Sequence, residues 1–198
     1  TGDPPLKSPK RSLRTSPKPR CSWCGDDPLY TKYHDKEWGR PVRNDQKMFE
    51  MLILEGFQAG LSWITILRKR ENFRKAFKNF DAKKISRMTA RDVRRLMQDA
   101  GIIRNRLKIE STITNAKCYL EVQREFGSFS RYLWQFTGGK TLRNPRGLRS
   151  GQIPATSPES DAMSKDLKKR GFKFVGSTIC YAHMQATGMV DDHVMGCW

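Results

Sequence analysis

Residues 54–63 decide the fold, and they read Leu54-Glu55-Gly56-Phe57-Gln58-Ala59-Gly60-Leu61-Ser62-Trp63. Before this stretch, Asn44 or Asp45 can cap a helix whose apolar residues include positions 48–53. After it, residues 63–77 place apolar side chains at helical spacing, with Lys and Arg between them. Because two glycines interrupt the pattern, the stretch predicts a helix, a break and a second helix.

The helical pattern continues through the rest of the chain. Thr89 followed by Asp92 resembles a capping box, and Ser157 with Pro158 resembles a helix start. Residues 137–156 contain four glycines and two prolines, which predicts a long loop. Since no run of residues alternates between apolar and polar, we expect no sheet and an all-α fold.

The composition points to a polyanionic partner. The 198 residues hold 38 Lys and Arg against 20 Asp and Glu, a formal net charge of +18. Such a charge attracts nucleic acid, because basic side chains that neutralise phosphates release counterions; an anionic membrane surface is the alternative. Residues 1–19 are rich in Pro, Ser and Lys, so we expect a disordered basic tail there and one domain over residues 20–198.

Cysteine usage and hydropathy bear on the compartment. The five cysteines are odd in number and scattered, which argues against a disulfide framework and favours a reducing, intracellular location. No apolar stretch is long enough to predict a membrane span. Ser-Pro-Lys elements in the tail favour the nucleus if the source is eukaryotic.

Four residues near the two ends of the domain form a possible metal set. His193 and Cys197 are four apart and share a face on a helical turn, while Cys21 and His34 lie near the start. Two thiolates and two imidazoles suit tetrahedral zinc. A buried thiol and an ordinary histidine remain the alternative, and Cys24 forms a second ligand-like pair with Cys21.

A carboxylate and several aromatic residues are candidates for a binding pocket. Glu55 follows an apolar helical run, so it is either a surface charge at a helix end or an acceptor placed in a pocket. His183 lies among apolar residues and is expected to be a core histidine. Aromatic rings either pack in the core or stack on a nucleobase; the candidates are Trp23, Tyr30, Tyr33, Trp38 and Trp63.

Several strings over residues 20–198 together resemble one family. They are Arg20-Cys21-x-Trp23, Asp27-Pro28-Leu29-Tyr30, Tyr33-His34-Asp35-x-Glu37-Trp38-Gly39, Leu54-Glu55-Gly56, Gln58-Ala59-Gly60-Leu61-Ser62-Trp63-Ile64-Thr65, Lys69-Arg70-Glu71-Asn72, Gln98-Asp99-Ala100-Gly101-Ile102-Ile103-Arg104, Lys168-Lys169-Arg170-Gly171-Phe172-Lys173-Phe174-Val175-Gly176 and Asp192-His193-x-x-Gly196-Cys197. The chain closely resembles the 3-methyladenine DNA glycosylase I family of the helix-hairpin-helix superfamily.

The resemblance implies a base pocket and a structural zinc ion. The pocket would consist of Glu55, Tyr33, Tyr30, Trp63 and Trp23. The zinc ion would join the start and the end of the domain, with no open position for a reactive water. Its ligands would be Cys21, His34, His193 and Cys197.

The resemblance also implies contacts with double-stranded DNA. Leu61 would wedge into the duplex, with Gln58 and Gly60 beside it. The hairpin of the helix-hairpin-helix motif would be residues 100–103, where amides near Gly101 would hold a phosphate. Further phosphate contacts would come from two basic strings, Arg68–Lys78 and Lys165–Lys173, the second including Lys169 and Arg170.

The implied function is DNA repair by a monomer. The enzyme would flip out 3-methyladenine, hydrolyse its N-glycosidic bond, release the free base and leave an abasic site, with no lyase step. The alternative is a non-catalytic, zinc-stabilised DNA-binding module that kept the fold.

Overall fold

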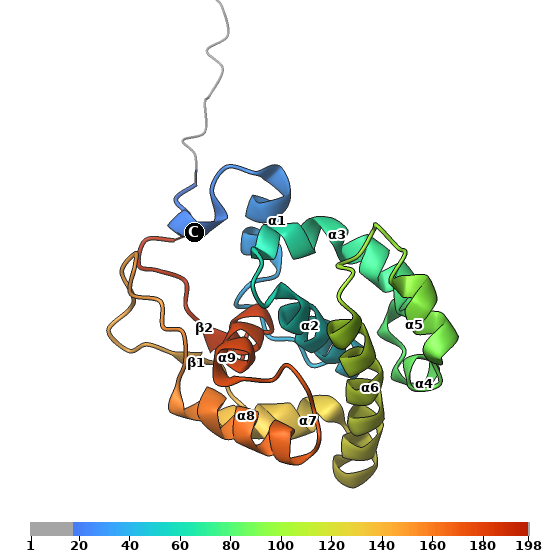
Figure 1. Cartoon of the computed structure of the whole chain (residues 1–198). Coiled ribbons are helices and arrows are strands. Elements are labelled where there is room, and N and C mark those ends of the chain that lie inside the picture. The colour runs from blue at the N-terminus through green and yellow to red at the C-terminus, as the bar shows by residue number, and fades with distance from the viewer. Residues whose placement is uncertain (1–17, 198) are drawn as a thin grey trace, which may run out of the picture.

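The computed structural model describes residues 18–197, and most of them are helical (Figure 1). Residues 1–17 of the predicted tail lie outside the described residues. The helical elements are η1 (Ser22–Cys24), α1 (Pro28–Lys36), α2 (Asp45–Gln58), α3 (Trp63–Ala76), η2 (Lys78–Phe80), α4 (Ala82–Ser86), α5 (Ala90–Leu96), α6 (Arg106–Phe126), α7 (Phe129–Trp134), η3 (Gln135–Thr137), α8 (Pro158–Lys169) and α9 (Ser177–Ala186).

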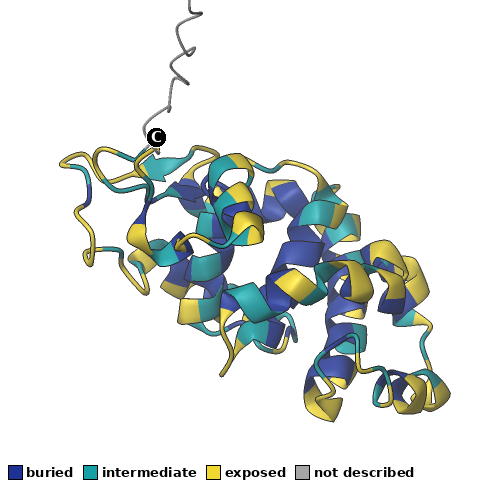
Figure 2. Cartoon of the chain, turned by 90° about the horizontal axis from the view of Figure 1, so that it is seen from above, coloured by how far each residue is buried: buried dark blue, intermediate teal, exposed yellow. Residues whose placement is uncertain are grey.

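Helix α2 is the centre of the fold. Every residue from Met48 to Phe57 is buried, so this helix is covered on all sides, which Figure 2 shows as a dark blue core. It packs against α3, α6, α7 and α9. The predicted cap is confirmed, because the Asn44 side chain accepts a hydrogen bond from the Lys47 amide at 2.9 Å.

The first residue of α2 also fixes a second helix. The Asp45 carboxylate accepts hydrogen bonds from the amides of Phe129 at 2.9 Å and Ser130 at 2.8 Å. These amides begin α7 and have no partner within their own helix. Asp45 therefore ties the start of the central helix to the start of α7.

The other predicted helix starts are also present. The Thr89 amide donates to the Asp92 carboxylate at 2.8 Å, and α5 follows. Ser157 caps α8 by accepting from the Ser160 amide at 3.1 Å, with Pro158 in the first turn. Each cap supplies an acceptor to an amide that the helix cannot satisfy itself.

His183 is a core histidine, as predicted. It is fully buried in α9, and its Nε2 donates to the Met48 carbonyl of α2 at 3.0 Å. Burial lowers the pKa of the ring to about 4, so the imidazole is neutral at pH 7. The hydrogen bond joins the two helices that flank the site described below.

The expectation of no sheet was wrong in one detail. Strands β1 (Leu142–Arg143) and β2 (Val190–Asp191) pair in parallel, with Leu142 opposite Val190 and Arg143 opposite Asp191. Two residues are too few to produce a visible alternation in sequence. The pair fastens the predicted loop before α8 to the segment after α9.

Candidate active site

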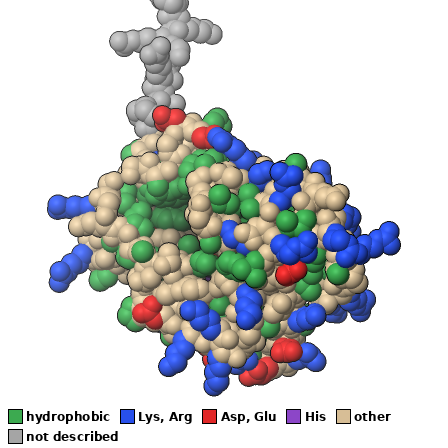
Figure 3. Space-filling view, viewed as in Figure 1, with side chains coloured by type: hydrophobic (Ala, Val, Ile, Leu, Met, Phe, Trp, Pro, Cys, Tyr) green, Lys and Arg blue, Asp and Glu red, His purple; other side chains and the backbone are tan. Residues whose placement is uncertain are grey.

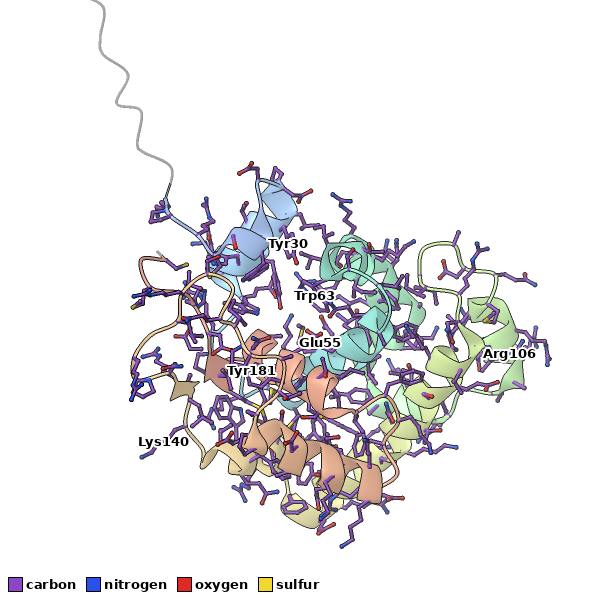
Figure 4. The ribbon with its side chains drawn as sticks, turned by 60° about the vertical axis from the view of Figure 1, so that its left-hand side comes forward. Tyr30, Glu55, Trp63, Arg106, Lys140 and Tyr181 are labelled. Atoms are coloured by element: carbon purple, nitrogen blue, oxygen red, sulfur yellow. The ribbon has the colours of Figure 1, made fainter. Side chains whose placement is uncertain are left out.

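A cavity of about 320 Å³ opens among α1, α2, α3 and α9. Figure 3 shows it as a hollow with mostly hydrophobic walls, and Figure 4 shows Tyr30, Glu55 and Trp63 around it. It brings together all five predicted pocket residues. The lining is Trp23, Tyr30, Tyr33, Trp38, Glu55, Gln58, Trp63, Ile153, Ala182 and Gln185.

The aromatic walls of the cavity support one another. The ring centroid of Trp23 lies 5.1 Å from that of Tyr30 and 4.9 Å from that of Trp38, both edge to face. Tyr33 lies 5.5 Å from Trp63 on the same measure. Such ring pairs attract one another and limit rotation. The walls are therefore largely set before any ligand enters.

Glu55 is the acidic group of the cavity and is only 4% exposed. It lies in the last turn of α2, which turns its side chain into the cavity rather than to the surface. Burial raises the pKa of its carboxyl to about 8. Within residues 18–197 neither a cation nor a hydrogen-bond donor is paired with it. A buried carboxyl in this state is typical of functional sites.

Other polar groups in the cavity also lack protein partners. The indole Nε1 atoms of Trp23 and Trp63 are buried without a hydrogen bond in the described part of the chain. Gln185 donates its Nε2 to the Asp192 carboxylate at 3.0 Å, which leaves its amide oxygen as the group free for a ligand. Buried polar groups are normally satisfied, so these atoms indicate a ligand site.

The loop between α2 and α3 forms one rim of this region. Gly60 has a φ of +80°, which explains a glycine there, and Leu61 next to it is 41% exposed. Gln58 lines both the main cavity and a neighbouring hollow of about 240 Å³, which Gly60 and Leu61 also line. Of the three residues predicted to contact DNA here, Gln58 thus lines the cavity, and Gly60 and Leu61 line the hollow beside it.

Lys108 supports this loop from below, and sequence reasoning missed it. Its Nζ donates to the carbonyls of Phe57 at 2.8 Å and Ala59 at 2.7 Å, at the end of α2. The residue is buried, which lowers the pKa of the amine. A lysine eight residues before the buried Ala116 shares its helix face, and that spacing is the signal that was available.

Three further residues of the cavity lining were not predicted from the sequence: Ile153, Ala182 and Gln185. Gln185 is a polar residue near the end of α9, a helix whose buried residues are mostly apolar, and this was a usable signal. Ile153 belongs to a loop without periodicity, so nothing in the sequence around it points to the cavity.

Beside the cavity lies a cluster of sulfur and nitrogen donors. The donor atoms of Cys21, His34 and Cys197 lie within 4.8 Å of one another. Cys197 Sγ is 3.3 Å from His34 Nε2, close to the separation of two ligands on one tetrahedral zinc ion. Two ends of the chain meet in this cluster, and its donors are of the kind that zinc binds.

His193, the fourth predicted ligand, stands next to this group rather than within it. Its ring centroid is 5.0 Å from that of His34. Gly39 makes room for it, since a Cβ there would come within 2.8 Å of His193 Cε1. Cys24 is also outside the group: its thiol donates to the Cys21 carbonyl at 3.2 Å.

Both histidines are oriented by carboxylates. His34 Nδ1 donates to Asp35 at 2.8 Å, and His193 Nδ1 donates to Asp191 at 2.7 Å. Arg20 in turn holds Asp35 through two hydrogen bonds of 2.8 Å. A carboxylate on one ring nitrogen leaves the other as the ligand atom, which is the usual arrangement around metal-binding histidines.

The basic residues of α3 are largely occupied within the protein. Arg70 makes two hydrogen bonds of 2.7 Å to Glu37, and Arg68 lies 2.7 Å from Asp27. Arg74 pairs with Glu50 and with its helix neighbour Glu71. These ion pairs hold α3 against α1 and α2, so the predicted phosphate contacts of this string compete with internal partners.

The remaining predicted DNA contacts lie away from the cavity lining. Lys169 is exposed at the end of α8, whereas Arg170 bonds Asp166 at 2.9 Å and also pairs with Glu125. Gly101 lies between α5 and α6, and its own amide donates to the Asp99 side chain at 2.8 Å.

Fold and site define a mainly helical protein with a cavity lined by aromatic rings and one buried carboxyl. The family model described as methyladenine glycosylase matches residues 23–198. DNA-3-methyladenine glycosylase 1 of Escherichia coli (strain K12) is 52% identical over 178 residues, covering 90% of this chain and 95% of that protein. The chain belongs to the methyladenine glycosylase family.

Solved structures agree. A crystal structure of 3-methyladenine DNA glycosylase I superposes with a TM-score of 0.88 at 50% identity, covering 91% of this chain and 98% of that one. A second crystal structure, of a variant of 3-methyladenine DNA glycosylase I in complex with 3-methyladenine, superposes with a TM-score of 0.86 at 36% identity. The match covers 90% of this chain and 95% of that one. As a glycosylase, the protein is a hydrolase.

The structure also bears on membrane association. Across residues 18–197, none of the helices combines the length and the apolar character that a membrane crossing requires. The nuclear assignment stays a prediction, because the Ser-Pro-Lys elements that suggested it lie almost wholly outside the described residues.

Proposed function

We propose that the protein excises 3-methyladenine from alkylated double-stranded DNA, acting as a monomer. It hydrolyses the N-glycosidic bond, releases the free base and leaves an abasic site. The observation that carries this proposal is Glu55, which is buried in an aromatic cavity and has no partner among residues 18–197. Similar proteins carry this activity in their names, and one relative is solved with 3-methyladenine bound.

The base enters the cavity after it has left the helical stack. Extrusion of a nucleotide costs a few kcal/mol, and stacking on aromatic rings returns about 1–3 kcal/mol per base. Trp63 and Trp23 offer the stacking faces, with Tyr30 and Tyr33 beside them. Leu61, exposed on the rim, fills the gap in the duplex, and Gln58 and Gly60 accompany it.

Glu55 selects the damaged base through charge. A 3-methylated adenine is cationic while still attached to its sugar, whereas an undamaged adenine is neutral. The Glu55 carboxyl has no cation partner in the described chain, so a cationic base is the partner that favours its ionised form. Its oxygens also accept hydrogen bonds from the amine on the edge of the base, close to Tyr33.

The same charge assists bond cleavage. The positive base is already a good leaving group, so a strong acid is not required. The sugar becomes positively charged as the bond lengthens, and ionised Glu55 with nearby DNA phosphates stabilises that charge. Among the described residues no lysine lines the cavity, which supports the absence of an amine nucleophile and therefore of a lyase step.

A structural zinc ion fits the neighbouring cluster. We assign it to Cys21, His34 and Cys197, whose donor atoms lie together, with His193 beside them as the fourth ligand, on the grounds of the donor chemistry and the two carboxylate-oriented rings. Bound there, the ion ties residue 21 to residue 197 and closes the domain that begins at residue 20. With four protein ligands it has no position open for water, so the reaction does not pass through it.

Contacts with the DNA backbone complete the proposal. Residues 100–103 join α5 and α6 as the hairpin of a helix-hairpin-helix, where amides near Gly101 face a phosphate. Exposed Lys169 adds a contact at the end of α8, and Arg170 beside it lends positive charge. These contacts hold the duplex without reading its sequence.

The test is a base-release assay. Wild-type protein is incubated with methylated duplex DNA, and free 3-methyladenine is measured by chromatography, with strand breaks measured before and after alkali. We expect released base and breaks only after alkali. Binding of DNA with no release would contradict the proposal and support the alternative, a non-catalytic module stabilised by zinc. Breaks without alkali would contradict the absence of a lyase step.

A further inference from the structure

The loop between β1 and α8 is built against the cavity. Ile153 lines the cavity itself, and Leu148 is only 5% exposed. The Leu148 carbonyl accepts a hydrogen bond from the Met195 amide at 2.7 Å, and Ser150 Oγ lies 3.0 Å from Ser22 Oγ. The loop is therefore attached at several points, and its outward side chains have a defined place.

The outward side chains of β1 and of the segments directly before and after it are basic. Residues 138–158 contain no Asp or Glu, and Lys140, Arg143, Arg146 and Arg149 recur at intervals of three. All four are exposed. Arg143 reaches Asp191 at 3.0 Å, but in the described part of the chain no carboxylate pairs with Arg146 or Arg149. This loop thus differs from α3, whose arginines have internal partners.

Two of these arginines line a surface hollow. It has a volume of about 580 Å³ and contains no carboxylate among its lining residues, which are Asn144, Arg146, Gly147, Leu148, Arg149, Gln152 and Met195. Two guanidinium groups and two amides can donate many hydrogen bonds to one anion. Arginine in particular matches the geometry of a phosphate group.

The position of the loop identifies the anion. In Figure 4 the labelled Lys140 and Arg106 lie on opposite sides of Glu55, and in Figure 3 basic side chains flank the hollow on both sides. A duplex that delivers a base into the cavity must run past both flanks. Its backbone carries one negative charge per 1.7 Å or so of helix axis, so each flank meets several phosphates.

We propose that residues 140–149 bind the DNA backbone on one side of the extruded nucleotide, with one phosphate seated between Arg146 and Arg149. The contact is independent of sequence and of damage, since it involves only phosphate. It rests on the proposed function in one respect: the cavity is where the extruded base goes.

The test uses the double variant Arg146→Gln/Arg149→Gln, with Lys117→Gln/Arg124→Gln as its matched control. The control removes the same charge from the C-terminal half of α6, which lies at the opposite end of the molecule from α1 in Figure 1 and contributes no residue to the cavity lining. The dissociation constant for damaged and undamaged duplexes is measured across salt concentrations. Loss of this one phosphate contact should lower the slope of log affinity against log salt by about 1 relative to the control.

Shortened duplexes show where the contact lies. One duplex lacks most base pairs on the 5′ side of the lesion and the other lacks those on the 3′ side. We expect the loop variant to bind one of them as the control variant does and to bind the other more weakly. Equal slopes and affinities for loop variant and control, on every duplex, would overturn the proposal.

Two further measurements distinguish the DNA contact from a defect in the cavity and from a site for a free anion. The rate of base release at saturating DNA should not change in the loop variant, because the cavity is intact. If the wild type releases no base, the proposed function fails, while the salt slopes still test the loop. Inorganic phosphate alone is titrated as well. Loop-dependent phosphate binding with no change in DNA affinity would assign the hollow to a free anion and overturn the DNA contact.

Discussion

The cavity and the Cys/His cluster lie side by side, but they differ in whether their buried polar side chains have hydrogen-bond partners. They share Trp23, whose ring centroid lies 5.1 Å from that of Tyr30 and 5.3 Å from that of His34. In the cavity, Glu55 has no partner within the described residues. In the cluster, His34 is bonded to Asp35, and Asp35 to Arg20.

From this difference we infer that the cavity serves the reaction and that the cluster serves the stability of the fold. A buried carboxyl without a partner destabilises the folded protein whenever it is ionised, and a cationic ligand relieves that penalty. A Cys/His cluster whose imidazole rings are already oriented by carboxylates is arranged for a metal ion, and binding of that ion would stabilise the folded protein. Changes in the cluster should therefore affect folding, and changes in the cavity should affect the reaction.

The largest expected effect is on stability, from Cys197→Ser. Loss of a thiolate weakens metal binding, and the metal's binding free energy contributes to folding, so the free energy of unfolding should fall by about 3–5 kcal/mol. The measurements are denaturant unfolding and zinc content. Cys118→Ser is the control, because Cys118 is a buried thiol outside the cluster. Unchanged zinc content in Cys197→Ser would show that this residue is not a ligand.

The next effect is on the reaction, from Glu55→Gln. The amide keeps the shape of the side chain but cannot become negative, so single-turnover release of 3-methyladenine should fall on the order of 10²–10³-fold. Affinity for undamaged DNA should stay the same. Glu121→Gln, an exposed carboxylate on α6, serves as the control. A release rate equal to that of the control removes Glu55 from the mechanism.

A smaller effect is expected at the end of α2, where Lys108 supports the loop on the rim of the cavity. Lys108→Met leaves the carbonyls of Phe57 and Ala59 without their donor, at about 1–3 kcal/mol of stability. Because the loop carrying Leu61 loses its support, release from duplex DNA should slow more than release from single strands. Lys117→Met on the same helix is the exposed control. Equal slowing on both substrates would mean that Lys108 only stabilises the fold.

Local signals in the sequence were sufficient for most of the fold. Asn44, Thr89 and Ser157 mark helix starts because capping depends on one or two nearby residues. The apolar run of α2 likewise indicates a buried helix, because it too is a pattern of residues that are close in sequence. The β1–β2 pair was missed because its strands are far apart in the chain and only two residues long.

In the candidate site, too, features that depend on nearby residues could be predicted, and features that depend on tertiary packing could not. Glu55 and the aromatic residues are close in sequence to recognisable strings, and the structure gathers them into one cavity. Whether Glu55 is a surface charge or a pocket group depends on α9 and the loop around Ile153, which come more than 90 residues later. The internal pairing of Arg70 with Glu37 also depends on tertiary packing, so charge alone overstated how basic α3 is toward DNA.

The most direct test of the account is the pH dependence of base release by wild type and Glu55→Gln. Burial raises the pKa of Glu55 to about 8 in the free enzyme, so only a minor fraction is ionised at pH 7. If the ionised carboxylate attracts the cationic base, kcat/KM should rise with pH, reach half its maximum near pH 8 and level off above that pH. The variant should be slower and lack this rise. The same rising profile in both proteins would contradict the central role of Glu55.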